Sequence, residues 1–149
     1  MTHAAFLKQA VDLSARSVKD GSSPFGCVIV DKGGRVIGTG YNRVVWDNDP
    51  TAHAEVMAIR AACQNIGSFD LSGCTLYASC EPCPMCLNAM KWANIRAAYY
   101  AATRDDADAI GFRDRLFHEI KPVKLHRLSL PRARAIMDKW AKSQKKKMY

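Results

Sequence analysis

The chain has 149 residues, of which 48% are hydrophobic and 24% charged, and this suits one domain, residues 1–149, with a buried core. No apolar run is long enough to span a bilayer and no secretion signal is recognisable, so we expect a cytoplasmic protein whose six cysteines stay reduced. The net charge of +8 falls to +3 without the five lysines that follow Asp138, and such a basic end suits either nucleic-acid binding or a solvated helix terminus.

Helical and extended patterns alternate along the chain. Apolar residues recur at three- and four-residue steps near the N-terminus, and Pro50 and Gly67 bracket a second helical stretch. Short apolar runs on either side of a glycine-containing turn predict a hairpin. In chain order we expect a helix over 3–18, strands over 27–30 and 35–41, a polar loop over 42–50, a helix over 51–66, a strand over 74–79, a helix over 84–93, strands over 96–101 and 123–128, and a helix over 131–145.

This order predicts an α/β fold. Strands that alternate with helices favour a central sheet with helices on both faces. We therefore expect a three-layer α/β/α sandwich with a five-stranded mixed sheet, antiparallel at the first hairpin and parallel later.

Two short motifs carry the chemistry of the chain. The first is His53-Ala54-Glu55, and the second is Pro82-Cys83-Pro84-Met85-Cys86. Together they offer one imidazole and two thiolates, three ligands that leave the fourth position of a tetrahedral zinc ion open, as catalytic zinc sites do. We therefore predict one Zn²⁺ per subunit, bound by His53, Cys83 and Cys86.

Both motifs fall where helices are expected to begin. At a helix N-terminus the backbone N–H groups and the helix dipole favour a thiolate over a thiol. Bound zinc lowers the pKa of a water towards neutrality, and Glu55 is the candidate carrier of its proton. Taken singly, His53 also suits a core histidine, Glu55 a surface helix and the two cysteines a redox pair; their combination favours the metal site.

The motifs resemble those of the cytidine-deaminase-like superfamily. H-x-E followed by P-C-x-x-C is the pattern of its zinc-dependent members, and the longer stretches Asn48–Arg60 and Ser79–Cys86 are similar to the branch that holds tRNA adenosine deaminases and small bacterial guanine deaminases. The segment Asp105–Asp114, with its Gly-Phe-x-Asp, resembles the guanine deaminases in particular.

This resemblance implies the remaining site residues. It implies that Asp114 takes part in catalysis and substrate binding beside the proton carrier Glu55, and that the base is bound by Phe25, Asn42, Ala54, Trp92, Asp114 and Tyr149. It also implies a homodimer in which the C-terminal segment, about 131–149, is exchanged so that Tyr149 covers the partner's site. One departure is Asn88, where relatives carry a small residue, and it raises a question about substrate preference.

Guanine suits these groups chemically. Its C2 is an amidine carbon that bears an amine, its ring N–H groups match an aspartate, an asparagine both donates and accepts, and aromatic walls stack on the flat ring. The expected reaction is hydrolytic deamination of guanine, a small purine base, to xanthine and ammonia.

Other functions stay open from the sequence. A tRNA adenosine deaminase would use the lysine-rich end, although a covered pocket would exclude an RNA strand. The same chemistry also suits guanosine or a guanine-like aminotriazine. A catalytically inactive binding module for purines or RNA is disfavoured because Glu55 is present.

Overall fold

The computed structural model describes residues 1–149 except 113, 115, 116, 118, 120 and 121. The chain forms two compact units, Met1–Arg115 and Leu116–Tyr149. Its elements are α1 (His3–Lys19), β1 (Gly26–Val30), β2 (Val36–Tyr41), α2 (Val44–Asp47), α3 (Ala54–Ile66), β3 (Thr75–Cys80), α4 (Pro84–Trp92), β4 (Ala97–Ala102), α5 (Arg104–Ala109) and α6 (Pro131–Ala141).

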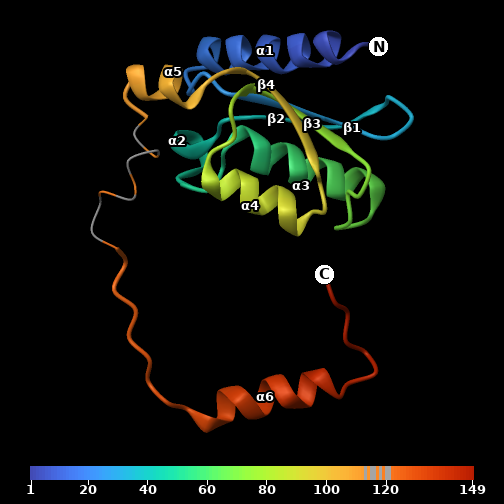
Figure 1. Cartoon of the computed structure of the whole chain (residues 1–149), viewed down its shortest axis with the longest axis vertical. Coiled ribbons are helices and arrows are strands. Elements are labelled where there is room, and N and C mark those ends of the chain that lie inside the picture. Colours follow the sequence, from blue (N-terminus) through green and yellow to red (C-terminus); the bar gives the residue numbers. More distant parts are fainter. Residues whose placement is uncertain (113, 115–116, 118, 120–121) are drawn as a thin grey trace. The chain divides into compact units, whose positions relative to one another are not determined.

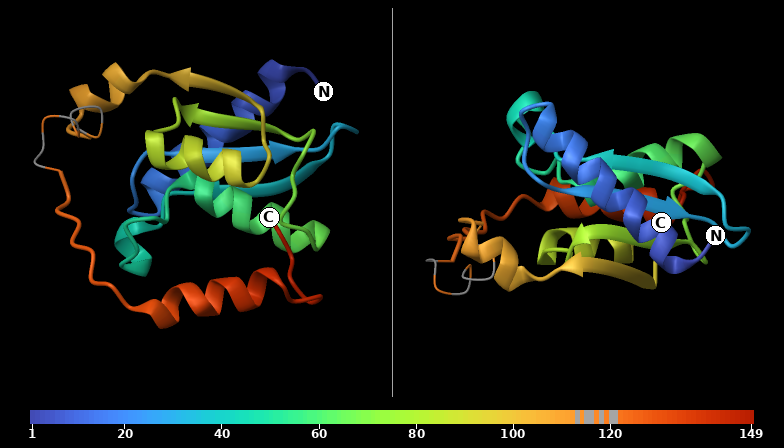
Figure 2. Two further views of the ribbon diagram at one scale, coloured as in Figure 1. Left: turned by 60° about the horizontal axis from the view of Figure 1, so that its bottom comes forward. Right: turned by 90° about the horizontal axis from the view of Figure 1, so that it is seen from above.

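The first unit is built on a mixed sheet with strand order β2-β1-β3-β4. Strand β1 is antiparallel to both β2 and β3, whereas β3 and β4 are parallel. Figure 1 shows α1 on one side of this sheet and α3 and α4 on the other, and the turned views in Figure 2 agree. The expected three layers and the parallel pair are therefore confirmed.

The prediction of a fifth strand is wrong. Residues 123–128 carry no regular secondary structure, and Val123 and Leu125 are 85% and 89% exposed. The described sheet has four strands. Alternating apolar residues express a local preference for extended backbone, but a strand forms only where a neighbouring edge accepts its hydrogen bonds, and the sheet pairs no strand with this segment.

The core lies on both faces of β1, which is buried along its whole length. Cys27 and Ile29 join the cluster under α3 and α4, while Val28 and Val30 pack with Phe6 of α1 on the opposite face. This split follows from the two-residue period of a strand. A short strand without polar residues is therefore covered by helices on both sides.

Helix α3 lies unusually close to strand β2. A Cβ atom built on Gly38 would lie 2.5 Å from the carbonyl oxygen of Ala58, and one built on Gly40 would lie 2.4 Å from that of Ala54. The facing residues of the helix are small and buried, including Ala54, Ala58 and Ala62. Glycine against alanine lets the two backbones approach, and this approach fixes the depth at which the N-terminus of α3 lies.

The second unit contains α6, which begins at Pro131 and ends at Ala141, four residues before the predicted end. An ion pair joins Arg134 and Asp138 at 2.9 Å, one turn apart. None of the described residues of this unit is buried. Across the described part of the chain, every helix is too short or too polar to cross a membrane.

Candidate metal centre and adjoining cavity

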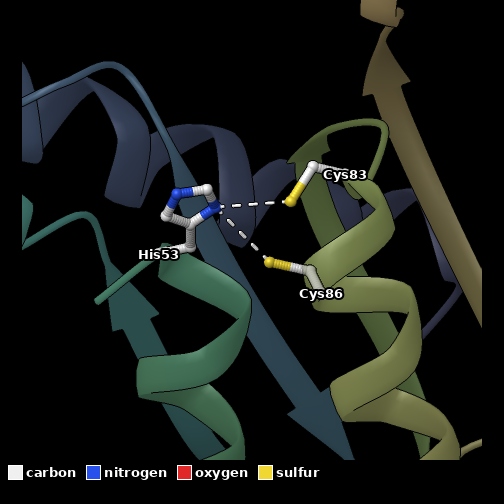
Figure 3. A group of neighbouring side chains, drawn as sticks. All are labelled: His53, Cys83 and Cys86. Carbon is white, nitrogen blue, oxygen red and sulfur yellow. Dashed lines mark hydrogen bonds between the residues drawn. The ribbon is translucent and has the colours of Figure 1, made fainter. Parts of the chain in front are cut away.

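The three predicted zinc ligands converge in the structure. The Nδ1 atom of His53 lies 3.5 Å from the Sγ atoms of both Cys83 and Cys86, as Figure 3 shows. All three ligand atoms lie within 4.8 Å of one another. A tetrahedral zinc ion with bonds of about 2.3 Å to sulfur and 2.0 Å to nitrogen would separate the two kinds of ligand by about 3.5 Å. The donor set and its spacing therefore fit zinc.

Two helix N-termini place these ligands. His53 is the N-cap of α3 and Cys83 is the N-cap of α4, and both have extended backbone with ψ of 157° and 167°. Pro84 occupies the first turn of α4, where its missing N–H costs nothing and its fixed φ suits a helix. Because His53 precedes the helix, its side chain and that of Glu55 both reach the site, although residues two apart within a helix would point about 200° apart.

The pKa values of the two thiol groups are shifted in opposite directions. Hydrogen bonds with Cys86 and His53 lower the pKa of the Cys83 thiol, whereas the hydrogen bond with Cys83 and burial raise that of Cys86. The hydrogen bond with Cys83 also raises the pKa of His53. Zinc binding therefore displaces a proton from this cluster, and its affinity should fall as the pH falls.

Glu55 lies directly beside the metal ligands. The residue is 8% exposed, and its Oε2 accepts a hydrogen bond from Sγ of Cys86 at 3.4 Å. Burial raises the pKa of this carboxyl group above its ordinary value. A carboxyl group in such surroundings exchanges protons more readily near neutral pH than an exposed one does.

A cavity of about 250 Å³ opens beside the metal cluster. His53, Glu55 and Cys83 form its metal side. The other residues that line it are Ser23, Phe25, Asn42, Val44, Val45, Pro50, Cys80, Glu81, Arg104, Phe112 and Asp114. The cavity thus combines apolar walls with a few polar groups, the usual composition of a small-molecule site.

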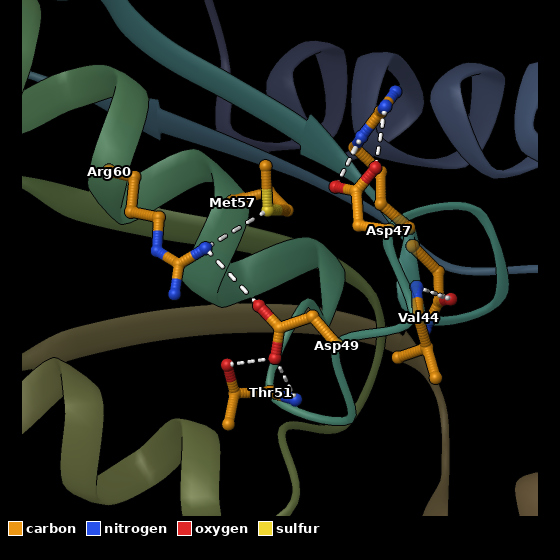
Figure 4. Close-up of polar contacts among 8 residues, drawn as sticks. Val44, Asp47, Asp49, Thr51, Met57 and Arg60 are labelled. Carbon is orange, nitrogen blue, oxygen red and sulfur yellow. Dashed lines mark hydrogen bonds and ion pairs between the residues drawn. The ribbon is translucent and has the colours of Figure 1, made fainter.

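The loop between β2 and α3 forms one wall, and polar contacts fix its shape (Figure 4). Asn42 begins it, with a side-chain Oδ1 that accepts from the N–H of Val44 at 3.1 Å. Arg43 holds Asp47 through two hydrogen bonds of 2.9 Å. Asp49 accepts from the N–H of Thr51 at 2.8 Å and from its hydroxyl at 2.6 Å. The residue pattern predicts a polar loop over 42–50, and the structure adds the single turn of α2 within it.

Another wall comes from the start of α5 and the segment that follows this helix. Arg104 is the first residue of α5 and forms an ion pair with Asp114. The rings of Phe25 and Phe112 meet edge to face, with centroids 4.9 Å apart. This wall therefore presents charged groups beside an aromatic pair.

The structure brings some of the residues implied by the resemblance to the cavity and leaves others elsewhere. Phe25, Asn42 and Asp114 line it. Ala54 is buried at the start of α3, and Trp92 is 63% exposed at the end of α4; neither lines the cavity. Tyr149 belongs to the second unit.

Asn88 is exposed and its side chain donates to the carbonyl of Pro84 at 2.9 Å, so it does not face the cavity. In the Gly-Phe-x-Asp segment, Arg113 lies outside the described residues.

Glu81, Arg104 and Phe112 also line the cavity, although neither the motifs nor the resemblance assigns them to the site. Phe112 lies inside the Gly-Phe-x-Asp segment, so its aromatic ring was a usable signal. Arg104 follows Thr103, which caps α5 in a capping box with Asp106; the spacing Thr-x-x-Asp predicts such a helix start. Nothing local marks Glu81, because its place in the cavity depends on how β3 and β4 lie side by side.

Comparison with known proteins places this geometry in a family. Residues 1–102 match the model of the cytidine and deoxycytidylate deaminase zinc-binding region. The guanine deaminase of Bacillus subtilis (strain 168) is 43% identical over 157 residues, 100% of both chains. An X-ray structure of guanine deaminase from Bacillus subtilis has a TM-score of 0.92 and covers 100% of this chain and 99% of that chain.

Two further relatives are less similar. The structure of a guanine deaminase from Nitrosomonas europaea is 32% identical, with a TM-score of 0.73 over 76% of this chain and 65% of that one. The tRNA-specific adenosine deaminase of Haemophilus influenzae is 36% identical over 115 residues, 77% of this chain and 66% of the relative. The chain belongs to the family of the cytidine and deoxycytidylate deaminase zinc-binding region.

Proposed function

We propose that this protein is a zinc-dependent guanine deaminase, which hydrolyses guanine to xanthine and ammonia. The observation that carries the proposal is the juxtaposition, in one cavity, of the metal cluster and Glu55 with the hydrogen-bonding side chains of Asn42 and Asp114. The full-length similarity to the Bacillus subtilis guanine deaminase supports the choice of base.

The proposed reaction assigns the proton transfers to Glu55. Zinc held by His53, Cys83 and Cys86 would supply Lewis acidity that makes a water acidic near neutral pH. Glu55 takes the proton of that water on its carboxylate and gives it to the ring nitrogen beside C2. It then takes the second proton of the water from the new hydroxyl group on C2 and gives it to the departing amine, so that ammonia leaves, the C2 carbonyl forms, and one carboxyl group serves as base and acid within a turnover.

Residues on the other walls of the cavity would bind and orient the base. Asn42 carries an amide that both donates and accepts, and Asp114 accepts from a ring N–H of the base. Phe25 and Phe112 supply aromatic surface against which a flat ring packs. Residues in these roles raise the effective concentration of the amidine carbon at the metal side.

The proposal includes the oligomeric state of the protein and its cellular compartment. The family resemblance supports a homodimer in which the segment of about 131–149 is exchanged and Tyr149 covers the partner's cavity. The six free cysteines support a reducing compartment such as the cytoplasm. Light scattering on the purified full chain tests the dimer: a mass of twice 16.5 kDa is expected, and a mass of one chain contradicts it.

A substrate panel tests the function. The zinc-loaded protein is incubated with guanine, guanosine, an aminotriazine, adenosine and a tRNA anticodon stem-loop, and ammonia and products are measured. We expect xanthine and ammonia in equal amounts from guanine. Inosine in the stem-loop, with guanine left intact, would establish a tRNA adenosine deaminase, the activity named for a relative that covers 77% of this chain.

A further inference from the structure

Arg104 links two parts of the cavity wall that are far apart in sequence. Its backbone N–H donates to Oε2 of Glu81 at 3.0 Å, and its Nη1 donates to the carbonyl oxygen of Glu81 at 3.1 Å. Glu81 in turn donates its N–H to Ala102 at 2.8 Å. These bonds fasten the start of α5 to the short loop that leads from β3 to the metal ligand Cys83.

The same guanidinium group holds Asp114. Nη2 of Arg104 pairs with Oδ1 of Asp114, and the two side chains are 20% and 16% exposed. Oδ2 of Asp114 is buried and has no hydrogen-bond partner among the described residues. The carboxylate is therefore held by one oxygen, and its second oxygen has an unused capacity to accept.

Charge explains why this contact matters. The described residues that line the cavity include three carboxyl groups, of Glu55, Glu81 and Asp114, and one guanidinium group, that of Arg104. A half-buried carboxylate beside two others is repelled by them unless a cation lies close. Removal of the cationic partner from such a pair leaves an uncompensated charge, which turns away or recruits water.

We propose that Arg104 is a positioning residue for substrate recognition, which keeps the Asp114 carboxylate at the wall of the cavity so that this carboxylate accepts a ring N–H of the substrate. This role rests on the proposed function, because it assigns to Asp114 a contact with the base. Arg104 acts through Asp114 and needs no contact of its own with the reacting atoms. Its link to Glu81 fixes the distance between this contact and the metal side of the cavity.

The first test replaces the guanidinium group. Arg104→Gln should retain zinc and stay folded at the assay temperature, with a lower midpoint of thermal unfolding because a largely buried ion pair is lost. It should lose about 10- to 100-fold in kcat/KM for guanine, the size of one charge-assisted hydrogen bond. Arg104→Lys keeps the charge but not the planar fork, and should recover part of the loss. Arg35→Gln is the matched control, since Arg35 pairs with Asp31 but is 82% exposed at the hairpin; it should leave kcat/KM unchanged.

A double-mutant cycle decides whether Arg104 acts through Asp114. If it does, Arg104→Gln combined with Asp114→Asn should lose no more activity than Asp114→Asn alone. Additive losses, or a loss of zinc or of thermal stability that accounts for the lower rate, overturn the proposal. Failure of the wild type to deaminate guanine contradicts the proposed function instead, and the cycle is then run with whichever compound of the panel releases ammonia.

Discussion

The two sides of the cavity come from different parts of the chain. The metal side, with His53, Glu55 and Cys83, lies within residues 1–102, the part that matches the family model. The recognition side, with Arg104, Phe112 and Asp114, lies beyond it. The family model therefore covers the residues of the zinc chemistry together with Phe25 and Asn42, and we expect the segment after β4 to contribute further to the choice of base.

The two sides are also held by different forces. The metal side is formed by two helix N-termini that are anchored on a buried sheet, and its ligands are buried or half-buried. The recognition side is held by a capping box at Thr103 and by the ion pair of Arg104 with Asp114. Substitutions on the metal side should abolish deamination. Substitutions on the recognition side should weaken substrate binding while zinc stays bound.

The largest effect is expected from a metal ligand. Cys83→Ser removes one of three protein ligands, so zinc content and guanine deamination should both fall to background. Metal analysis and ammonia release measure the two quantities. Cys63→Ser is the control, because Cys63 is a free cysteine outside the cluster. A Cys83→Ser protein with full zinc and full activity would show that the cluster is not the catalytic centre.

A substitution of Glu55 tests proton transfer on the metal side separately from metal binding. Glu55→Gln keeps the shape of the side chain but cannot carry a proton, so kcat should fall by about 10²- to 10⁴-fold. Its zinc content serves as the control and should match that of the wild type. Normal turnover by this variant contradicts the assignment of the proton transfers to Glu55.

Asp114 tests the recognition side. Asp114→Asn should lower kcat/KM for guanine by about 10- to 100-fold through the loss of one charged hydrogen bond, with zinc content unchanged. Steady-state kinetics and metal analysis give both values. Asp12→Asn is a matched surface control, since Asp12 forms an exposed ion pair with Lys8 on α1. An equal loss of zinc in the Asp114 variant would remove the distinction between the two sides.

The smallest effect is expected at the C-terminus. Met148 and Tyr149 are 70% and 75% exposed, so their deletion should leave thermal unfolding unchanged. If Tyr149 covers a partner's cavity, as the family resemblance implies, the deletion should lower guanine turnover several-fold because water enters the site. Tyr149→Phe should keep most of the activity. An unchanged rate after deletion removes this residue from the proposed site.

Much of the fold was predictable because it follows from local patterns. The helix α1, the hairpin of β1 and β2, and the parallel pair of β3 and β4 all match the periodicity of the sequence. The clustering of His53, Cys83 and Cys86 was predictable because the ligand types and their spacing suit one metal ion. For α1 and the hairpin a short stretch of sequence contains the whole physical cause, whereas the parallel pair follows from the order of the elements and the metal cluster from its ligand types.

The rest depends on contacts that no short stretch contains. The segment 123–128 has the pattern of a strand but pairs with no strand in the described sheet. Glu81 and Arg104 are 23 residues apart, and their contact exists because β3 and β4 end at the same edge. Trp92 was assigned to the site from resemblance alone, and its position at the exposed end of α4 does not follow from the motif.

Two positions of β2 carry no side chain, and this sets the distance between the strand and helix α3. Because Gly38 and Gly40 present no side chain to α3, any methyl group added there would act as a wedge and lift the helix off the strand. The imidazole at the start of that helix would move with it, although neither glycine lines the cavity. Attempts to redesign the cavity for another base should therefore leave both glycines unchanged, since the packing of α3 on β2 determines the position of His53.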